Sequence, residues 1–212
     1  HDLAHLPRSR QKLPHVGAFY YTESMVANRH QVSGERYQEP IRLMVGLGNP
    51  GPRYRDTYHN AGKTAVAYFA DKLPRGVAAL PSSAFMNESG GFVKRALAAT
   101  RRKPGELLVV HDDSDLPLGT YKLGFGRGDG GHQGVRSIIE ALSTSAKGGS
   151  ASGGKKFWRL RIGIRPPTDP ASGRPKAGSF VLKKIAKEDA DVLRVVFERA
   201  LAEVTTLCAS PQ

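Results

Sequence analysis

Two histidines have the type and setting for chemistry, and each also has a simpler structural explanation. His59 lies in Tyr58–Gly62 at the expected start of a helix, where an imidazole can act as a general base or cap the helix. His132 follows a glycine-rich stretch near another expected helix start, and its position fits phosphate binding or capping. Taken singly, neither histidine identifies a reaction.

Acidic residues gather just past a buried apolar run. Asp112, Asp113 and Asp115 follow Glu106–Val110, and such carboxylates can bind a divalent cation or simply solvate a turn. Asp112 falls at the carboxyl end of the expected strand, where open α/β sheets place their sites. We expect an acidic turn over His111–Asp115.

Two glycine patterns match the dinucleotide-binding fingerprint. They are Gly46–Gly51, which follows an apolar run, and Gly126–Gly131. That fingerprint needs a helix that starts at the turn, whereas Pro50 and Pro52 keep the chain turned just past the run. We therefore expect a tight turn that holds Asn49 at the carboxyl end of a strand, and not a dinucleotide site.

The composition narrows the class of protein. The 212 residues carry 32 Lys and Arg against 19 Asp and Glu, a net charge of +13. No apolar run approaches the roughly 18 residues that cross a bilayer. The single cysteine, Cys208, excludes an internal disulfide scaffold, and we expect it as a small apolar residue on a helix. The charge fits a polyanionic partner or a solvated surface.

The chain divides into two parts at about residue 40. Residues 1–40 hold five basic and four acidic residues, so almost all of the net charge lies on 41–212. The first part has no apolar signal-peptide core and is acidic for a transit peptide. We expect a poorly ordered N-terminal extension over 1–40 and a folded domain over 41–212. Cytoplasmic and mitochondrial locations both stay open.

Apolar runs and helical spacing alternate along the second part. We expect strands at 41–47, 106–110, 121–123, 158–164 and 179–182, and helices at 61–73, 90–99, 133–142 and 188–208. Residues 145–154 are rich in Gly and Ser and indicate a flexible loop. Strands that alternate with helices predict an α/β layered fold.

Basic residues cluster in the second half of the chain. They are Lys122, Arg127, Arg136, Lys155, Lys156, Arg159, Arg161 and Arg165. Arg159 and Arg161 share one face of an expected strand, because side chains alternate there. We expect a solvated positive face, which suits a phosphate backbone or simple solubility.

Six motifs then occur in an order typical of one family. They are Val45–Gly51, Tyr58–Gly62, Phe85–Gly90, His111–Pro117, Gly130–Gly134 and Arg159–Ile164. In this order the chain resembles the bacterial-type peptidyl-tRNA hydrolase family over residues 41 to about 206. The resemblance implies a single three-layer α/β domain with a central mixed β-sheet flanked by helices. It also implies hydrolysis of the ester between peptide and tRNA, no metal or organic cofactor, and a monomer that binds the tRNA acceptor arm and no membrane.

The resemblance also implies roles for particular residues. His59 matches the catalytic histidine, Asp112 the carboxylate beside it, and Asn49 and Asn87 the two asparagines of the site. A neutral imidazole oriented by a carboxylate can activate water, and carboxamides can donate to the developing oxyanion. These roles suit an ester, which is easier to hydrolyse than an amide.

Five further positions match binding residues of the family. Lys122 and Arg161 match residues that clamp the tRNA 5′ phosphate, and Tyr54 and Met86 match residues that line the peptide groove. Gln133 stands where the family usually has an asparagine, and its longer side chain shifts any hydrogen bond that it makes.

Two stretches depart from the family pattern. The segment 74–84 is shorter than the corresponding stretch of the family, so we expect it to run extended and to shorten the usual sheet. The glycine loop Gly124–Gly131 is reshaped and includes Arg127 and Asp129. Altered loops also suit a non-catalytic RNA-binding relative. Convergence of the four catalytic candidates on one pocket favours the enzyme, whereas scattered positions favour the binding module.

Overall fold

The computed structural model describes residues 39–143, 156–166, 178 and 180–209. Its elements are β1 (Leu43–Gly46), η2 (Tyr58–Asn60), α1 (Ala61–Phe69), β2 (Ala78–Pro81), η3 (Met86–Glu88), α2 (Ser89–Thr100), η4 (Pro104–Glu106), β3 (Leu107–Pro117), β4 (Tyr121–Phe125), α3 (Gln133–Ser143), β5 (Trp158–Arg165) and α4 (Lys187–Cys208). The expected loop at 145–154 and all but the last two residues of the expected N-terminal extension lie outside the described residues.

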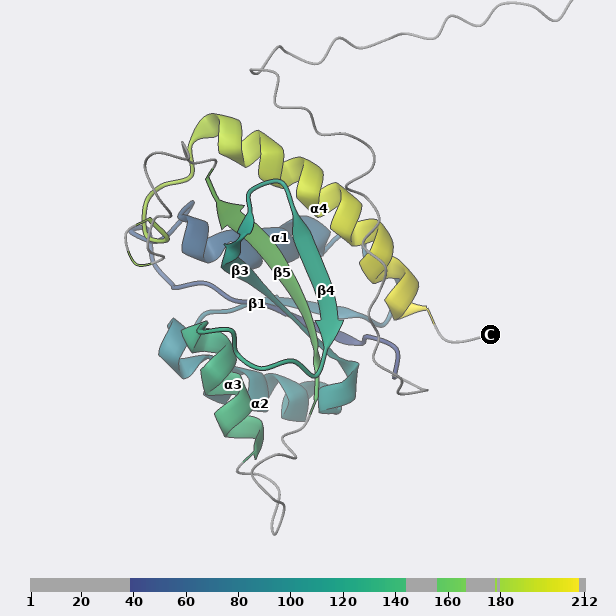
Figure 1. Cartoon of the computed structure of the whole chain (residues 1–212). Coiled ribbons are helices and arrows are strands. Elements are labelled where there is room, and N and C mark those ends of the chain that lie inside the picture. Colours follow the sequence, from purple (N-terminus) through teal and green to yellow (C-terminus); the bar gives the residue numbers. More distant parts are fainter. Residues whose placement is uncertain (1–38, 144–155, 167–177, 179, 210–212) are drawn as a thin grey trace, which may run out of the picture.

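The strands form one mixed sheet in the order β2-β1-β3-β5-β4. All neighbouring pairs are parallel except β4 and β5, which are antiparallel. Helices α1 and α4 cover one face, and α2 and α3 cover the other (Figure 1). This arrangement confirms the expected three-layer α/β fold with a central mixed sheet.

Each strand of the sheet centre is buried on both faces. In β3, Leu108 and Val110 pack toward α1 and α4, while Leu107 and Val109 pack toward α2 and α3. Helices on both sides explain why the strand sequences are continuous apolar runs without polar alternation.

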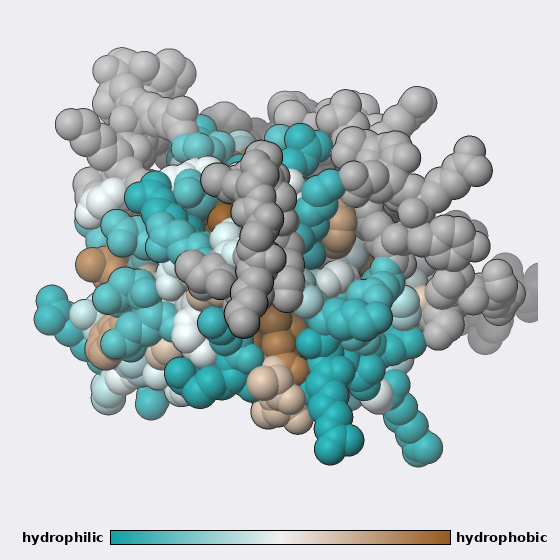
Figure 2. All heavy atoms as spheres, turned by 90° about the horizontal axis from the view of Figure 1, so that it is seen from below, coloured by the Kyte–Doolittle hydropathy of each residue, from teal (hydrophilic) through white to brown (hydrophobic). Residues whose placement is uncertain are grey.

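The outer helices are amphipathic. In α3, Val135, Ile138 and Leu142 are buried at helical spacing, and Arg136 is exposed between them. Seen from the side of α2 and α3, the surface is largely hydrophilic with a small apolar patch (Figure 2). On the other face, α4 buries Cys208 in the core, as expected. Within the described part of the chain, no helix is both long and apolar enough to cross a membrane.

Two expected elements differ in the structure. The turn expected at His111–Asp115 is wrong, because β3 continues through Pro117 beside β5, whose arginines supply partners for the acidic side chains. The strand expected at 179–182 is also wrong, since residues 180–182 form a turn in which the Lys183 N–H donates to the Phe180 carbonyl. Phe180 contributes to the core from this turn and not from a sheet.

Residues 74–84 follow the expectation in part. The chain is extended over Ala78–Pro81, which pairs with β1 and forms one edge of the described sheet. That this sheet is shorter than usual for the family stays a prediction.

Candidate active site

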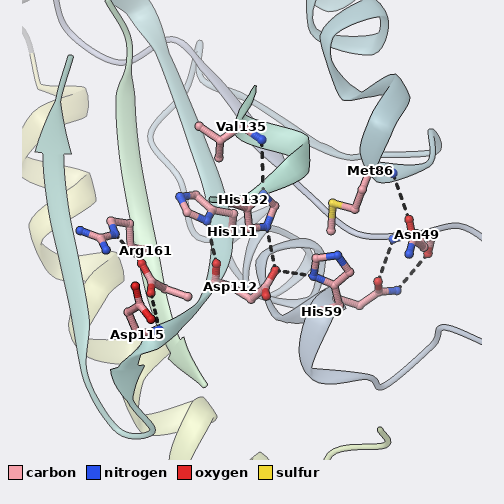
Figure 3. A network of polar contacts seen from close by, with 11 residues as sticks. Asn49, His59, Met86, His111, Asp112, Asp115, His132, Val135 and Arg161 are labelled. Carbon is pink, nitrogen blue, oxygen red and sulfur yellow. Dashed lines mark hydrogen bonds and ion pairs between the residues drawn. The ribbon is translucent and has the colours of Figure 1, made fainter. Parts of the chain in front are cut away.

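His59 and Asp112 come from different elements and meet just past the carboxyl end of β1, beside the middle of β3. The Nδ1 atom of His59, in η2, lies 3.0 Å from Oδ1 of Asp112, in β3 (Figure 3). The approach depends on Gly62 at the start of α1, because a Cβ there would lie 2.3 Å from the Val110 carbonyl oxygen. The glycine of the Tyr58–Gly62 motif therefore lets α1 pack close enough to place the histidine.

His132 shares the same carboxylate oxygen. Its Nε2 also lies 3.0 Å from Oδ1 of Asp112, while its Nδ1 accepts the Val135 N–H at 3.3 Å. Because a backbone N–H can only donate, Nδ1 holds a lone pair and Nε2 carries the proton that is donated to Asp112. Of the two roles that the sequence left open for His132, phosphate binding and capping, the bond from the Val135 N–H supports capping. Its bond to Asp112 went unpredicted, since no sequence spacing links residues that meet only after folding.

A third histidine, His111, lines the cavity next to His132. His111 is 2% exposed, and its Nδ1 donates to the Asp112 backbone carbonyl at 2.7 Å. Burial, reinforced by the neighbouring His132, lowers the pKa of His111 well below its usual value. Its ring lies edge-on to that of His132, with the centroids 4.6 Å apart. His111 is therefore a neutral, fixed part of the wall.

The charges of the pair reinforce each other. Burial opposes the charged form of His59, but the hydrogen bond and the charge of Asp112 outweigh it, so the pKa of His59 is raised above 6.5. Burial likewise opposes ionisation of Asp112, but the N–H groups that His132 and His59 direct at its Oδ1 outweigh burial and hold the pKa of Asp112 far below its usual value. Asp112 is thus a buried carboxylate that remains ionised.

Asn49 is fixed with a known orientation. Its backbone N–H donates to the Asn60 side-chain oxygen at 2.8 Å, and the Asn60 amide donates back to its carbonyl at 3.0 Å. Its own side-chain oxygen accepts the Met86 N–H at 3.0 Å. Since that oxygen is used, the side-chain NH₂ is the group that Asn49 offers to a ligand.

Asn87 is held by the contact between α2 and α3. Ser137 of α3 donates to the Asn87 carbonyl at 2.9 Å and accepts the Gly90 N–H at 3.0 Å. A Cβ on Gly90 would lie 2.2 Å from the Ser137 carbonyl oxygen, so a glycine is needed here. This contact explains the glycine that ends the Phe85–Gly90 motif.

Six of the nine predicted site residues line one cavity of about 630 Å³. They are Asn49, His59, Met86, Asn87, Asp112 and Gln133. Tyr54 does not line it, but its ring contacts that of Phe85, a lining residue, with the centroids 6.2 Å apart. The predicted catalytic residues therefore converge, as the enzyme hypothesis requires.

Lys122 and Arg161 lie outside the cavity. They are directly opposed on β4 and β5, so both side chains belong to the same face of the sheet. Lys122 is exposed, and Arg161 donates through Nε to Asp113 at 2.5 Å while staying 31% exposed. Asp113 and Asp115 pair with arginines of β5, and this accounts for the acidic cluster without a cation.

Arg159 contradicts the expected solvated face. It is only 3% exposed, and its guanidinium donates to the Gly128 carbonyl at 2.5 Å. Burial and the neighbouring Arg161 lower the pKa of Arg159 to about 10. The glycine loop lies over this arginine, so Arg159 is buried, whereas Arg161 remains partly open to solvent.

The geometry argues against two kinds of ligand, a dinucleotide and a metal ion. No helix begins at Gly51, because residues 51–56 form turns before η2, and the dinucleotide interpretation therefore fails. The ligand atoms of His59, Asp112 and His132 lie within 4.8 Å of one another, as in a metal site. Two N–H donors on one carboxylate oxygen, at 3.0 Å each, account for that cluster without an ion.

Comparison with known proteins agrees with the family resemblance of the sequence. Residues 43–79 and 74–211 match the family model of peptidyl-tRNA hydrolase, in two segments that meet in the stretch that we expected to be short. A crystal structure of a peptidyl-tRNA hydrolase with N-propanol is 31% identical, with a TM-score of 0.64, and the match covers 79% of this chain and 88% of that one. A crystal structure of peptidyl-tRNA hydrolase from Acinetobacter baumannii shares 30% sequence identity with this chain and superposes with a TM-score of 0.65. That match covers 82% of this chain and 91% of the other. The chain belongs to the bacterial-type peptidyl-tRNA hydrolase family.

Proposed function

We propose that this protein hydrolyses the ester between a peptide and the 3′-terminal ribose of tRNA and releases free tRNA and peptide. The observation that carries the proposal is the convergence of His59, Asp112 and Asn49 on one cavity, with His59 hydrogen-bonded to Asp112. A module that only binds RNA has no need of a buried carboxylate that orients an imidazole. The geometry therefore favours the enzyme over a non-catalytic relative.

His59 acts as the general base through Nε2, since Nδ1 is engaged with Asp112. Nε2 takes a proton from water while the water oxygen bonds to the ester carbonyl carbon, and the negative charge of Asp112 stabilises the imidazolium that forms. The tetrahedral intermediate then collapses, the bond to the ribose 3′ oxygen breaks, and the imidazolium returns its proton to that oxygen. The raised pKa of His59 makes it a stronger base at the cost of its neutral fraction in acid.

The asparagines supply neutral donors for the carbonyl oxygen. Asn49 presents its NH₂ group because its oxygen is bonded to Met86, and Asn87 lines the same cavity from η3. A well-placed donor to the developing oxyanion contributes about 3 kcal/mol. Donors that do not titrate also leave the balance of charge around Asp112 unchanged.

Substrate binding divides between two sides of the site. Met86 and Phe85, with Tyr54 behind them, offer apolar surface for the peptide, and Gln133 lines the cavity at the start of α3. Lys122 and Arg161 face the tRNA phosphate, and the acceptor arm follows this edge of the sheet. A monomer suffices, since each catalytic candidate comes from one chain.

The decisive experiment is hydrolysis of an N-acetylaminoacyl-tRNA by the wild type and by His59→Ala. We expect kcat to fall about 10³-fold, within the range for loss of a general base, while the affinity for tRNA and the melting temperature change little. Near-normal turnover by His59→Ala would rule out His59 as the base. A wild type that binds this substrate without cleaving it would establish the non-catalytic alternative.

A further inference from the structure

The glycine loop between β4 and α3 joins the basic edge of the sheet to the active site. It leaves β4 after Phe125, crosses to the start of α3, and contributes Asp129, Gly130 and Gly131 to the cavity wall (Figure 1). Three of its glycines, Gly126, Gly130 and Gly131, have positive φ, so the path depends on conformations that other residues rarely adopt. Such a loop needs fixed points to hold one shape.

Arg159 supplies the first fixed point. Its guanidinium is buried and donates to the Gly128 carbonyl at 2.5 Å. A charged donor that is shielded from water makes a stronger hydrogen bond than a neutral one. The middle of the loop is thereby fixed to β5.

Asp129 supplies the second fixed point, shortly before His132. Its Oδ1 accepts the Gly131 N–H at 2.6 Å, and its backbone carbonyl accepts the His132 N–H at 3.1 Å. Its Oδ2 accepts from Nε of Arg136, one turn into α3, at 3.2 Å. One residue therefore binds both the approach to α3 and the first turn of that helix.

The contacts of Asp129 end on a residue of the active site. His132 is the residue whose backbone Asp129 holds, and it donates through Nε2 to the carboxylate that orients His59. A small shift of this backbone moves the His132 ring away from Oδ1 of Asp112. The carboxylate then loses one of its two N–H donors.

We infer that Asp129 is a positioning residue: its carboxylate fixes the entry to α3 so that His132 donates to Asp112 and Asp112 keeps its orientation toward His59. The inference rests on the proposed function for its kinetic consequence. The exposed ion pair with Arg136 adds little, because solvent screens pairs at the surface. The charge-assisted bond to the Gly131 N–H does the holding.

The test compares Asp129→Ala, Asp129→Asn and Arg136→Ala on an N-acetylaminoacyl-tRNA. We expect Asp129→Ala to lower kcat about tenfold with KM within about twofold of the wild type. Asp129→Asn, whose amide oxygen still accepts the Gly131 N–H, should restore kcat to within about threefold, and Arg136→Ala should change it less than about twofold. A raised KM with unchanged kcat would show instead that Asp129, which lines the cavity, contacts the substrate.

A second readout needs no substrate. The His132 Nε2 proton, bonded to a buried carboxylate, should give a slowly exchanging downfield proton resonance in the wild type and in Asp129→Asn. Asp129→Ala should broaden or remove that resonance, and its retention would overturn the inference. If the wild type hydrolyses no peptidyl-tRNA, the proposed function fails, while loss of the resonance in Asp129→Ala still supports the positioning role.

Glu198→Ala is the matched control. Glu198 forms an exposed ion pair with Arg194 in α4, on the opposite face of the sheet. Its removal tests whether loss of any exposed carboxylate lowers kcat. We expect kcat, KM and the His132 resonance to stay at wild-type values, and a tenfold loss of kcat would overturn the assignment to Asp129.

Discussion

The cavity at His59 and the sheet edge at β4 and β5 use polar side chains in opposite ways. At the cavity, a buried carboxylate, Asp112, receives N–H donors from two histidines at 3.0 Å each (Figure 3). At the edge, Lys122 is exposed, and Arg161 pairs with Asp113 and stays partly open to solvent. The cavity fixes the orientation of its side chains, whereas the sheet edge exposes positive charge.

We expect this difference to separate catalysis at the cavity from tRNA binding at the sheet edge. A buried network is strong because its groups cannot rearrange toward water, and it fails when one partner is lost. Exposed cations attract phosphates over several ångströms, are screened by salt, and tolerate imprecise geometry. We therefore expect changes at the cavity to lower kcat and changes at the edge to raise KM.

The largest effect short of removing the base should come from Asp112→Asn. We expect kcat to fall about 10³-fold, because the imidazolium loses its charged partner. Burial then acts unopposed on His59 and lowers its pKa, so the acid limb of the pH–rate profile moves to lower pH. Measured from pH 5 to 9, an acid limb that stays in place would show that Asp112 does not set the pKa of His59.

The pH–rate profile of the wild type should depend on the pKa of His59 in the same direction. The pKa of His59 is raised in the folded protein, so activity that needs the neutral imidazole appears as the pH rises through a value above 6.5. Stability linked to protonated His59 runs the other way: it is present below the unfolded pKa and lost as the pH rises through the folded one.

A smaller loss is expected from Asn49→Asp. The new carboxylate still accepts the Met86 N–H but has no NH₂ group for the carbonyl oxygen. We expect kcat to fall about 10²-fold, the usual effect of one missing oxyanion donor, with little change in melting temperature. Asn49→Ala is the comparison, since it also loses the bond to Met86. Equal kcat and unequal stability in the two variants would separate the two roles of the side chain.

The smallest effect belongs to the sheet edge. Removing both cations in Lys122→Ala/Arg161→Ala should raise KM about tenfold and leave kcat near the wild-type value. The slope of log KM against log salt should become shallower by about 0.7 to 0.9 for each phosphate that the variant no longer neutralises. Arg194→Ala, an exposed arginine of α4, is the control. A fall in kcat with unchanged salt dependence would break the division between the two regions.

Sequence patterns predicted much of this architecture because local and tertiary requirements agree there. The apolar runs of β1 and β3 and the spaced apolar residues of α4 indicate their own burial. The ordered motifs around Asn49, His59, Asn87 and Asp112 predicted four residues that line one cavity. The structure then gave a reason for one glycine of these motifs, since Gly62 allows α1 to approach β3 closely.

The failures share a cause. The acidic residues of β3 look like a turn until the arginines of β5 lie beside them, and Phe180 looks like part of a strand until a turn buries it. Arg159 looks exposed until the glycine loop covers it. In each case the missing fact was the identity of a neighbour that is distant in the chain.

What the sequence by itself determined was the layered α/β fold, the family and the catalytic candidates, because apolar periodicity and motif order are local properties of the chain. Only the tertiary structure decided that His132 shares the carboxylate of Asp112 with His59, and that Arg159 is buried beneath the loop that carries Asp129. Hydrogen bonds between side chains depend on distances of about 3 Å across separate elements, and no spacing along the chain encodes such distances.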